Sequence, residues 1–437
     1  MDLAGLDTAA VARALGEIAD REGDLADAFL ERLEEVELVQ GEDGPTSRLR
    51  REEGLAVRLV REGRTHLASR DGLVPAAFVE AARQAARAQP RGVLAEPAMP
   101  AGLAPPEAAP ELAEFALTVE RAIRARHVAF PLRLAVRRHR RVVQVIGPRL
   151  VAPASAERFW SAAAHTPWGA VGRLLPGLGA GAAEELALAL VALFRTRFAE
   201  PPAAARATVV LAPAAAAVLL HEAVAHALEV DTLARSGNPE SAVGVALGAA
   251  SLNVLDDPAA APEGVARSTD DEGQPVVRRW LLRGGVVEQP LADACWARSS
   301  TMLLPGAGRR GSRHALPGPR STYLELLPGD AKEADLLAAS RGGLYLPEAS
   351  RGALDPLSGT FHLEARHARR IAGGELGEAT GPCRLQGRLS DLLAQVSGVG
   401  DQASPGGAGW CAKGGQKLAV WASAPALRLE SVEIEPR

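Results

Sequence analysis

The chain has 437 residues, of which 47% are hydrophobic and 23% charged, and a formal net charge of −4. This balance is typical of a globular protein and excludes a disordered one, and the length predicts more than one domain. The small negative charge gives no basic field, so we expect no nucleic-acid partner. Three scattered cysteines are too few for a disulfide framework, which favours a reducing compartment.

The apolar segments are short and predict no membrane span. The longest, residues 207–220, is too short to cross a bilayer and contains Pro213. The N-terminal residues are acidic and lack a basic stretch followed by an apolar run, so no secretory signal is expected. We therefore expect a cytoplasmic protein with no membrane contact.

The first 200 residues predict helices together with an antiparallel meander of short strands. Helical apolar spacing occurs at 8–21, 75–88, 111–126 and 182–198. Strand-like runs occur at 26–31, 36–40, 55–60, 66–69 and within 132–146. A stretch rich in proline, alanine and glycine, residues 89–110, predicts a loop.

A basic run, Arg137-Arg138-His139-Arg140-Arg141, lies inside the predicted strands of 132–146. Contact with phosphate or nucleic acid is one explanation of such a run. We prefer the solvated face of an edge strand or hairpin, by about three to one.

Pro201-Pro202 marks a predicted domain boundary. A strand is expected at 208–211, a helix begins at Pro213, and short strands with Gly/Pro turns follow to the C-terminus. The fold class is therefore α+β. We expect an N-terminal α+β domain, residues 1–203, with an antiparallel sheet and helices, and a mostly β C-terminal domain, residues 204–437, that carries the chemically important helix.

The most specific signal is His221-Glu222-Ala223-Val224-Ala225-His226. It is similar to the His-Glu-x-x-His motif of zinc peptidases, in which two imidazoles four residues apart share one helical face. Here the spacing is five residues, so a regular helix would rotate the second imidazole by about 140° from the first. We therefore predict a π-type turn, or a break near Ala225, that brings both rings to one ion.

The residue types in this motif suit metal-dependent hydrolysis. Neutral imidazole binds zinc well, three protein ligands leave a fourth position for water, and zinc lowers the pKa of that water to about 7. Glu222 would take the proton from the water and pass it to a leaving amine. Two buried histidines satisfied by hydrogen bonds are an equally good explanation of the spacing alone, so a third ligand must decide.

The third ligand must come from far along the chain, and Cys411 is the strongest candidate. It lies in the glycine-rich stretch 406–416, where glycines allow close backbone approach and Lys413 favours a thiolate. An inert buried thiol is the common alternative. Four other residues are possible substitutes: Cys383, His314, His362 and His367.

Together these residues resemble the TldD/PmbA family of peptidases. The metal-bearing subunit of that family has His-Glu-Ala-Val-Gly-His followed by an acidic residue, matched here by 221–226 with Glu229 and Asp231. Its C-terminal Cys-Gly-Lys-x-Gly-Gln is matched by residues 411–416, and its Asp-Glu-Gly element by 270–273. The order of 342–345 and 358–361 also agrees. The N-terminal meander looks similar too, though more weakly, so the resemblance covers nearly the whole chain.

The resemblance implies a zinc-dependent peptidase with His221, His226 and Cys411 as ligands and Glu222 as base. It also implies a two-domain subunit with a mostly antiparallel core, in a dimer whose site faces an internal cavity with a narrow opening. Family members act on short or unstructured peptides, including precursors of modified peptides. A homodimer, or a heterodimer with a related TldE/PmbA-like subunit that lacks the metal motif, is therefore expected, and the substrate-binding residues stay unassigned.

The chain departs from the family pattern at several positions near the metal motif. Ala225 and Ala412 replace glycines, and the bulky Trp410 precedes the cysteine. Residues 317–323 lack the asparagine of the family's Pro-x-Pro-Arg-x-x-Asn. These departures predict intact metal binding with a changed choice of substrate.

Two other functions stay open. In a non-catalytic partner subunit, zinc would only join the helix to the C-terminal strands, but such a structural site needs no Glu222 and usually has a fourth protein ligand. A different metal-dependent hydrolase, such as an amidase, is compatible with the same fold.

Overall fold

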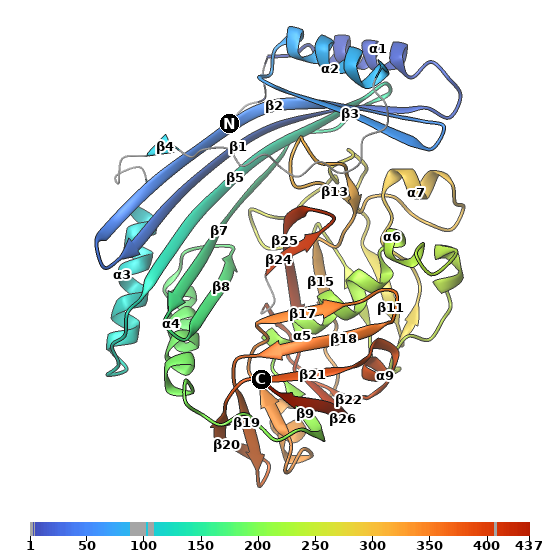
Figure 1. Ribbon diagram of the computed structural model, residues 1–437. Coiled ribbons are helices and arrows are strands. Elements are labelled where there is room, and N and C mark those ends of the chain that lie inside the picture. Colours follow the sequence, from blue (N-terminus) through green and yellow to red (C-terminus); the bar gives the residue numbers. More distant parts are fainter. Residues whose placement is uncertain (1–2, 4, 88–101, 104–108, 406–408) are drawn as a thin grey trace.

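A long, curved antiparallel sheet forms the first half of the protein, and its strands make the arch in Figure 1. The computed structural model describes residues 3, 5–87, 102–103, 109–405 and 409–437. The strand order is β3-β2-β1-β5-β7-β8, with β4 (Gly102–Leu103) paired to β2 and β6 (Leu150–Val151) paired to β5. The bounds are β1 Leu25–Gly41, β2 Gly44–Arg61, β3 Arg64–Asp71, β5 Arg133–Gly147, β7 Ser155–Thr166 and β8 Gly169–Leu175.

The strands of this sheet are longer than the sequence predicts. The separate runs 26–31 and 36–40 belong to one strand, β1, because the mostly charged residues 32–35 between them stay paired with both β2 and β5. Pairing on both sides supplies backbone hydrogen bonds that local propensity does not anticipate. Most of the predicted loop 89–110 lies outside the described residues.

The predicted helices of this half are confirmed to within a few residues. They are α1 Thr8–Ile18, α2 Pro75–Arg87, α3 Pro110–Arg124 and α4 Ala180–Arg195. Asp7 caps α1, because its carboxylate accepts from the N–H groups of Ala9 and Ala10. α1 and α2 pack on the sheet near one end of the arch, and α3 and α4 pack together near the other (Figure 1).

The basic run of β5 faces acidic residues of the neighbouring strand β1. Arg137 and Arg141 form ion pairs with Glu37 and Glu31, at 2.7 and 2.8 Å, and Nδ1 of His139 lies 2.8 Å from the Glu35 carboxylate. The prediction of a solvated edge strand was wrong, because β5 lies between β1 and β7 in the interior of the sheet. Opposite charges on adjacent strands, rather than solvent or nucleic acid, explain the run.

The second half is built on two further large sheets around one apolar core, together with a short pair, β13 (Gly308–Arg309) and β14 (Gly318–Pro319). The first sheet runs β17-β18-β21-β26-β9-β16-β19-β20, and β22 pairs with β26. Its strands are β9 Ala205–Leu211, β16 Leu344–Leu346, β17 Arg351–Leu354, β18 Thr360–Ala365, β19 Ala368–Ala372, β20 Glu375–Thr380, β21 Cys383–Arg388, β22 Val396–Val399 and β26 Leu427–Pro436. The buried core contains residues of both sheets and of the helix that begins at Pro213.

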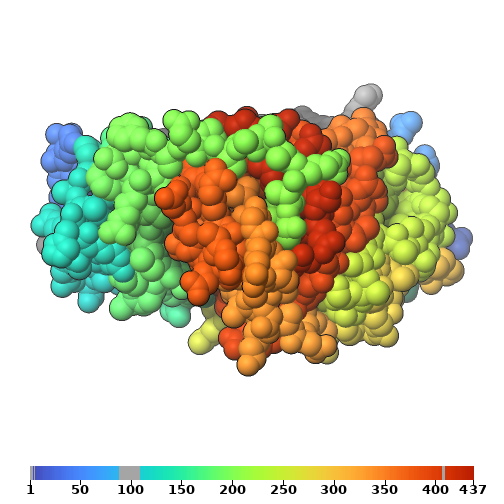
Figure 2. All heavy atoms as spheres, turned by 90° about the horizontal axis from the view of Figure 1, so that it is seen from below, coloured from blue at the N-terminus to red at the C-terminus, as the bar shows by residue number. Residues whose placement is uncertain are grey.

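The second of these sheets carries the C-terminal hairpin. It runs β12-β11-β10-β15-β25-β23, and β24 pairs with β25. Its strands are β10 Val254–Asp256, β11 Arg279–Arg283, β12 Val286–Val287, β15 Tyr323–Leu326, β23 Ser404–Pro405, β24 Gly409–Lys413 and β25 Gln416–Ala424. In the space-filling view of Figure 2, C-terminal segments in orange and red occupy the middle of the face, beside the cyan and green residues of α3 and α4.

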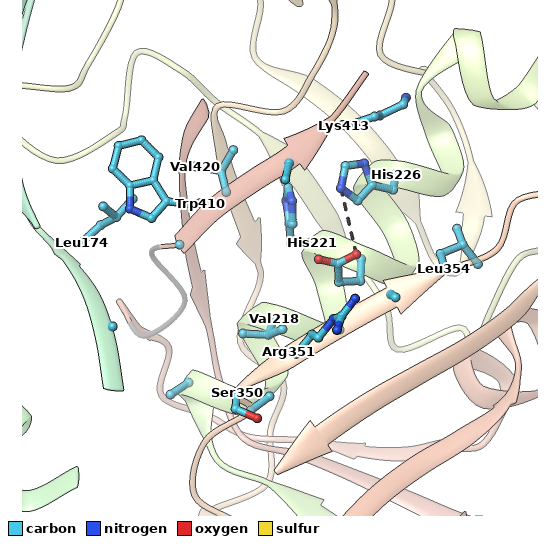
Figure 3. A pocket seen from close by; sticks show the side chains of 18 of the residues that line it. Leu174, Val218, His221, His226, Ser350, Arg351, Leu354, Trp410, Lys413 and Val420 are labelled. Atoms are coloured by element: carbon cyan, nitrogen blue, oxygen red, sulfur yellow. Dashed lines mark ion pairs between the residues drawn. The ribbon is translucent and has the colours of Figure 1, made fainter. Parts of the chain in front are cut away.

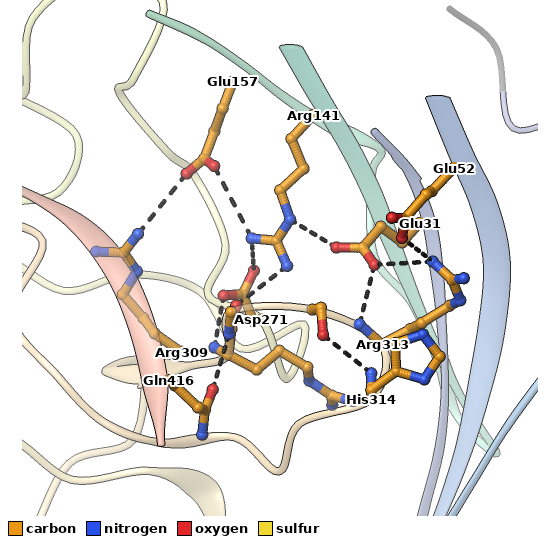
Figure 4. A network of polar contacts seen from close by, with 12 residues as sticks. Glu31, Glu52, Arg141, Glu157, Asp271, Arg309, Arg313, His314 and Gln416 are labelled. Carbon is orange, nitrogen blue, oxygen red and sulfur yellow. Dashed lines mark hydrogen bonds and ion pairs between the residues drawn. The ribbon is translucent and has the colours of Figure 1, made fainter. Parts of the chain in front are cut away.

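A buried ion network joins the arch to two segments of the second half, residues 267–272 and 309–313 (Figure 4). Its ion pairs include Arg58–Glu272 at 2.7 Å, Arg267–Glu157 at 2.9 Å, Arg313–Glu52 at 3.2 Å, Arg310–Asp27 at 3.3 Å and Arg141–Asp271 at 3.7 Å. The carboxylate of Asp270 accepts from the N–H groups of Glu272, Gln274 and Gly308 and so shapes the loop. The Asp-Asp-Glu-Gly element therefore joins the two halves.

Across the part of the chain that the structure describes, we find no helix with both the length and the apolar character needed to cross a bilayer.

Candidate metal centre

The helix that begins at Pro213 changes its geometry at the first histidine. α5 (Pro213–Leu220) is followed by a π-turn at His221–Ala225, a 3₁₀ turn at His226–Leu228 and α6 (Val230–Leu233). The N–H of His226 donates to the carbonyl of His221, five residues back. This wider turn places residues that are five positions apart on the same face of the helix. The ring centroids of His221 and His226 accordingly lie 4.6 Å apart. The predicted π-type distortion is confirmed.

Cys411 reaches this turn from the C-terminal hairpin β24–β25. Lys413 pairs with Gln416 across Gly414 and Gly415, whose φ angles of 60° and 75° suit the two-residue turn of a twisted hairpin. These two glycines therefore make the turn, whereas the sequence suggested close backbone approach to a metal. The Sγ atom of Cys411 lies 3.4 Å from Nε2 of His226.

The three predicted ligands form one group of donor atoms. One ligand atom each of His221, His226 and Cys411 lies within 4.8 Å of the others. Bond lengths of about 2.0–2.3 Å would separate the donors of a tetrahedral site by roughly 3.5 Å. Nε2 of His221 is buried and has no hydrogen-bond partner among the described residues, while its Nδ1 lies 3.4 Å from the Ser321 hydroxyl. An orphaned nitrogen facing a second imidazole and a thiol fits a metal cation.

Glu229 orients the second histidine. Its Oε2 lies 2.9 Å from Nδ1 of His226, which leaves Nε2 directed at Cys411. Burial opposes a charge on His226, but Glu229 and Cys411 outweigh it and raise the pKa of His226 to about 11. The surroundings of His226 thus favour positive charge, and a metal cation would compete with the proton for Nε2 of its ring. A carboxylate behind a ligand histidine also fixes its ring and tautomer.

Three neighbouring side chains hold Glu229 in its ionised form. Burial opposes ionisation, but His226, Arg320 and Lys413 outweigh it and lower the pKa of Glu229 to about 2. The ammonium of Lys413 contacts Glu229, donates to Asp231 at 2.7 Å and to Thr232 at 3.0 Å. Lys413 therefore supports the residues behind the ligands, where the sequence suggested a role beside the thiol.

Glu222 lies beside the donor group and is weakly paired. Its Oε2 is 4.0 Å from Nε2 of His226. Gly352 of β17 packs against it so closely that a Cβ there would lie 2.5 Å from Cγ of Glu222. Burial raises the pKa of Glu222 to about 7, which suits a group that accepts and returns a proton near neutral pH.

A cavity of about 610 Å³ opens onto His221, Glu222 and His226. Its apolar wall includes Leu174 of β8 and Trp410 and Val420 of the C-terminal hairpin (Figure 3). Trp410 is held by His139 and Phe159, at ring-centroid distances of 5.4 and 5.9 Å. The N-terminal sheet thus contributes to one wall of the cavity.

The substitute ligands lie in other surroundings. Nδ1 of His314 is 2.9 Å from the Ser69 hydroxyl, His362 lies 4.0 Å from Glu364, Cys383 is buried in β21, and His367 follows β18.

Sequence reasoning left several supporting residues unassigned. Of these, Glu229 has a signal in the sequence, its spacing of three residues after His226, whereas Ser321 and Gly352 have none.

The comparisons with known proteins agree with this architecture. Residues 204–435 match the model of the PmbA/TldA metallopeptidase C-terminal domain. A protein named metalloprotease TldD homolog from Buchnera aphidicola is 31% identical over 220 residues, which cover 50% of this chain and 45% of that protein. One from Haemophilus influenzae is 30% identical over 219 residues, which also cover 50% and 45%. The chain thus spans about half the length of the curated relatives it matches.

A solved structure shows the same fold over almost the full length. The crystal structure of TldE from Thermococcus kodakarensis has a TM-score of 0.73 at 17% sequence identity and covers 97% of this chain and 99% of that chain. This likeness, with the matched domain and the predicted motifs, leads to one conclusion. The chain belongs to the TldD/PmbA metallopeptidase family.

Proposed function

We propose that this protein is a zinc-dependent peptidase, with His221, His226 and Cys411 as metal ligands and Glu222 as general base. The observation that carries the proposal is the convergence of two imidazoles and a thiol, within 4.8 Å, beside a weakly paired carboxylate. A site that only held the fold together would need no such carboxylate.

Zinc fits the donor set best. Imidazole nitrogen and thiolate sulfur favour zinc over magnesium or calcium, which prefer oxygen. Three protein donors leave a coordination position open, as in catalytic rather than structural zinc sites. When bound, the metal would supply Lewis acidity that polarises a peptide carbonyl and makes water more acidic.

The chain's own residues would carry the proton and orient the ligands. Glu222 would accept a proton from the attacking water and deliver it to the nitrogen of the leaving amine. Its burial against Gly352 keeps the carboxylate near the donor group. Ser321 and Glu229 would hold the two imidazoles with their Nε2 atoms facing the cation.

The wider setting is proposed from the same features. A cavity of about 610 Å³ suits a short or unstructured peptide, so we propose such substrates, including precursors of modified peptides.

We propose a domain boundary at 203/204, because the arch sheet ends before it and β9 begins the second half at Ala205. The fold of TldE supports assembly as a homodimer or with a TldE/PmbA-like chain, and the thiol ligand suits the cytoplasm.

The test separates metal binding from catalysis. Zinc per chain and cleavage of a mixture of unstructured peptides are measured for the wild type, Glu222→Gln and the exposed turn variant Glu42→Gln. We expect Glu222→Gln to retain zinc and to lose about 10²–10⁴-fold in activity, because general acid–base catalysis contributes that much. Glu42→Gln is expected to match the wild type. Cleavage at the normal rate by Glu222→Gln would contradict the proposed base, and a wild type that binds zinc without cleaving would favour the non-catalytic subunit.

A further inference from the structure

The charged residues of the cavity wall differ in whether they already have partners. Arg173 of β8 pairs with Glu348, and Lys413 contacts Glu229 and Asp231. Arg351 and Arg235 also line the cavity and are exposed. Among the described residues, neither of these two guanidinium groups makes a side-chain hydrogen bond or ion pair. Two positive charges are therefore open to a ligand.

Arg351 is the closer of the two to the proposed chemistry. It begins β17, and the next residue, Gly352, packs directly against Glu222. Both Arg351 and Glu222 line the cavity, and the positive charge of Arg351 acts on the Glu222 carboxylate, although the two groups form no ion pair within 4.0 Å. Its cross-strand neighbour Glu364 is already engaged by Arg384 at 2.8 Å and by Arg437. Within the described ranges, Arg351 therefore has no carboxylate of its own.

Arg235 adds a second cation at the same cavity. It follows α6, the helix that carries Asp231 and Thr232 behind the metal ligands. Asp231 is already bound by Lys413 at 2.7 Å. The cavity therefore has more positive than negative charge facing its solvent space, while the neighbouring wall of Leu174, Trp410 and Val420 is apolar.

We propose that Arg351, assisted by Arg235, makes this site selective for peptides that present a carboxylate within one or two residues of the cleaved bond. The planar guanidinium matches a carboxylate through two parallel hydrogen bonds. The spacing follows from the backbone, because Arg351 adjoins the residue that touches the general base and an extended peptide rises by about 3.3 Å per residue. The inference rests on the proposed peptidase function and assigns its substrate class. The carboxylate has two sources, an acidic side chain or the free C-terminus of the substrate.

The test uses the zinc-loaded full chain and matched unstructured peptides. One pair differs only in Glu or Gln beside the cleaved bond, and a second pair differs only in a free or amidated C-terminus. We expect the wild type to cleave one carboxylate-bearing peptide with a kcat/KM about tenfold higher than its neutral match, as expected for a charge-assisted hydrogen bond. The pair that shows the preference identifies the source of the carboxylate.

Variants assign the preference to Arg351. Arg351→Gln is expected to bring the ratio of the two kcat/KM values close to one, Arg351→Lys to an intermediate value, and Arg235→Gln to a smaller loss. Arg83→Gln, an exposed arginine of α2, removes the same charge far from the cavity and is expected to keep the ratio. A ratio near one in the wild type, or a preference that survives Arg351→Gln, overturns the proposal. So does an equal fall of kcat for both peptides, which would make Arg351 a transition-state group without selectivity.

A binding measurement separates this inference from the proposed function. Fluorescence anisotropy of labelled peptides with zinc-loaded Glu222→Gln reports recognition without cleavage. Tighter binding of the carboxylate peptide, lost in the double variant with Arg351→Gln, supports the inference even if the wild type cleaves nothing. Equal binding of both peptides overturns the inference while leaving the peptidase proposal intact.

Discussion

The buried ion network and the candidate metal centre both join segments far apart in the sequence, but they treat buried charge in opposite ways. In the network, opposite charges already face each other: Asp271 accepts from Arg267 at 2.9 Å and from the backbone N–H of Arg310 at 2.9 Å. In the metal centre, Nε2 of His221 has no partner among the described residues, and the thiol of Cys411 faces Nε2 of His226.

The ion network therefore holds the two halves together, whereas the candidate metal centre is arranged to bind a ligand. The charges of the network compensate one another, so the network needs no added ion. Removing one partner would leave the other charge buried and unpaired. A convergent set of lone pairs is incomplete without a cation. We therefore expect chelation to remove activity while leaving the arch attached to the second half, and the following changes test that separation.

The largest effect is expected from removing the thiol ligand. Cys411→Ala should reduce both zinc content and peptide cleavage to background, because it removes the thiol that the C-terminal hairpin contributes to the three-donor group. Elemental analysis of purified protein measures the metal. Cys383→Ala, a buried thiol of β21, is the matched control and should keep its zinc. Full zinc content in Cys411→Ala would remove this cysteine from the ligand set.

Breaking the buried ion network should destabilise the protein without emptying the metal site. Asp271→Asn leaves Arg267 and Arg141 short of negative charge, and loss of one partner of a buried pair costs about 3–5 kcal/mol. Urea unfolding measures the change, with Asp43→Asn in an exposed turn expected within about 0.5 kcal/mol of the wild type. A change below about 1 kcal/mol would mean that the network contributes little.

The contacts between the acidic residues of β1 and the basic run of β5 should make the stability of the protein depend on pH in the acidic range. Burial opposes the ionisation of Glu35, but His139, with Arg137 and Arg50, outweighs it and lowers its pKa to about 2 from an ordinary 4.5. A carboxylate with a lowered pKa stabilises the fold above its unfolded pKa, and this contribution disappears as the pH falls from 4.5 toward 2.

Unfolding of the wild type and Glu35→Gln, measured from pH 7 to pH 3, tests this contribution. The stability difference should be greatest above pH 5, at most about 3 kcal/mol, and should shrink on acidification. Zinc binding at pH 7 should be the same in both proteins. A difference that does not vary with pH would contradict the role of the Glu35 charge.

The smallest effect is expected from removing the charge of Glu229 behind the candidate metal centre. Glu229→Gln keeps a hydrogen-bond acceptor for His226 but removes the charge behind it. Changes to a residue that orients a ligand histidine weaken metal affinity by about 10- to 100-fold. Competition with a chromophoric zinc chelator measures the affinity, and Glu42→Gln is the control. Unchanged affinity would show that geometry alone, without the charge of Glu229, prepares His226.

Local features were predictable from the sequence to different degrees. The helices followed from apolar spacing and capping, and the π-turn followed from two histidines five residues apart in an apolar helix. These features depend on neighbours within one or two turns of the chain. The prediction failed for β5, which appeared as an edge strand because its partners Glu31, Glu35 and Glu37 lie about a hundred positions away in the chain.

The sequence by itself determined the helices of the first half, the chemical motif and the family, since residue type, order and spacing carry that information. Only the tertiary structure decided that Cys411 lies 3.4 Å from His226 and that Ser321 and Glu229 stand behind the two imidazoles. It also decided that Arg351 lines the cavity with no side-chain partner in the described part of the chain. The physical reason is that these contacts form across sheets and loops, where the partner of a side chain is set by packing and strand pairing rather than by distance along the chain.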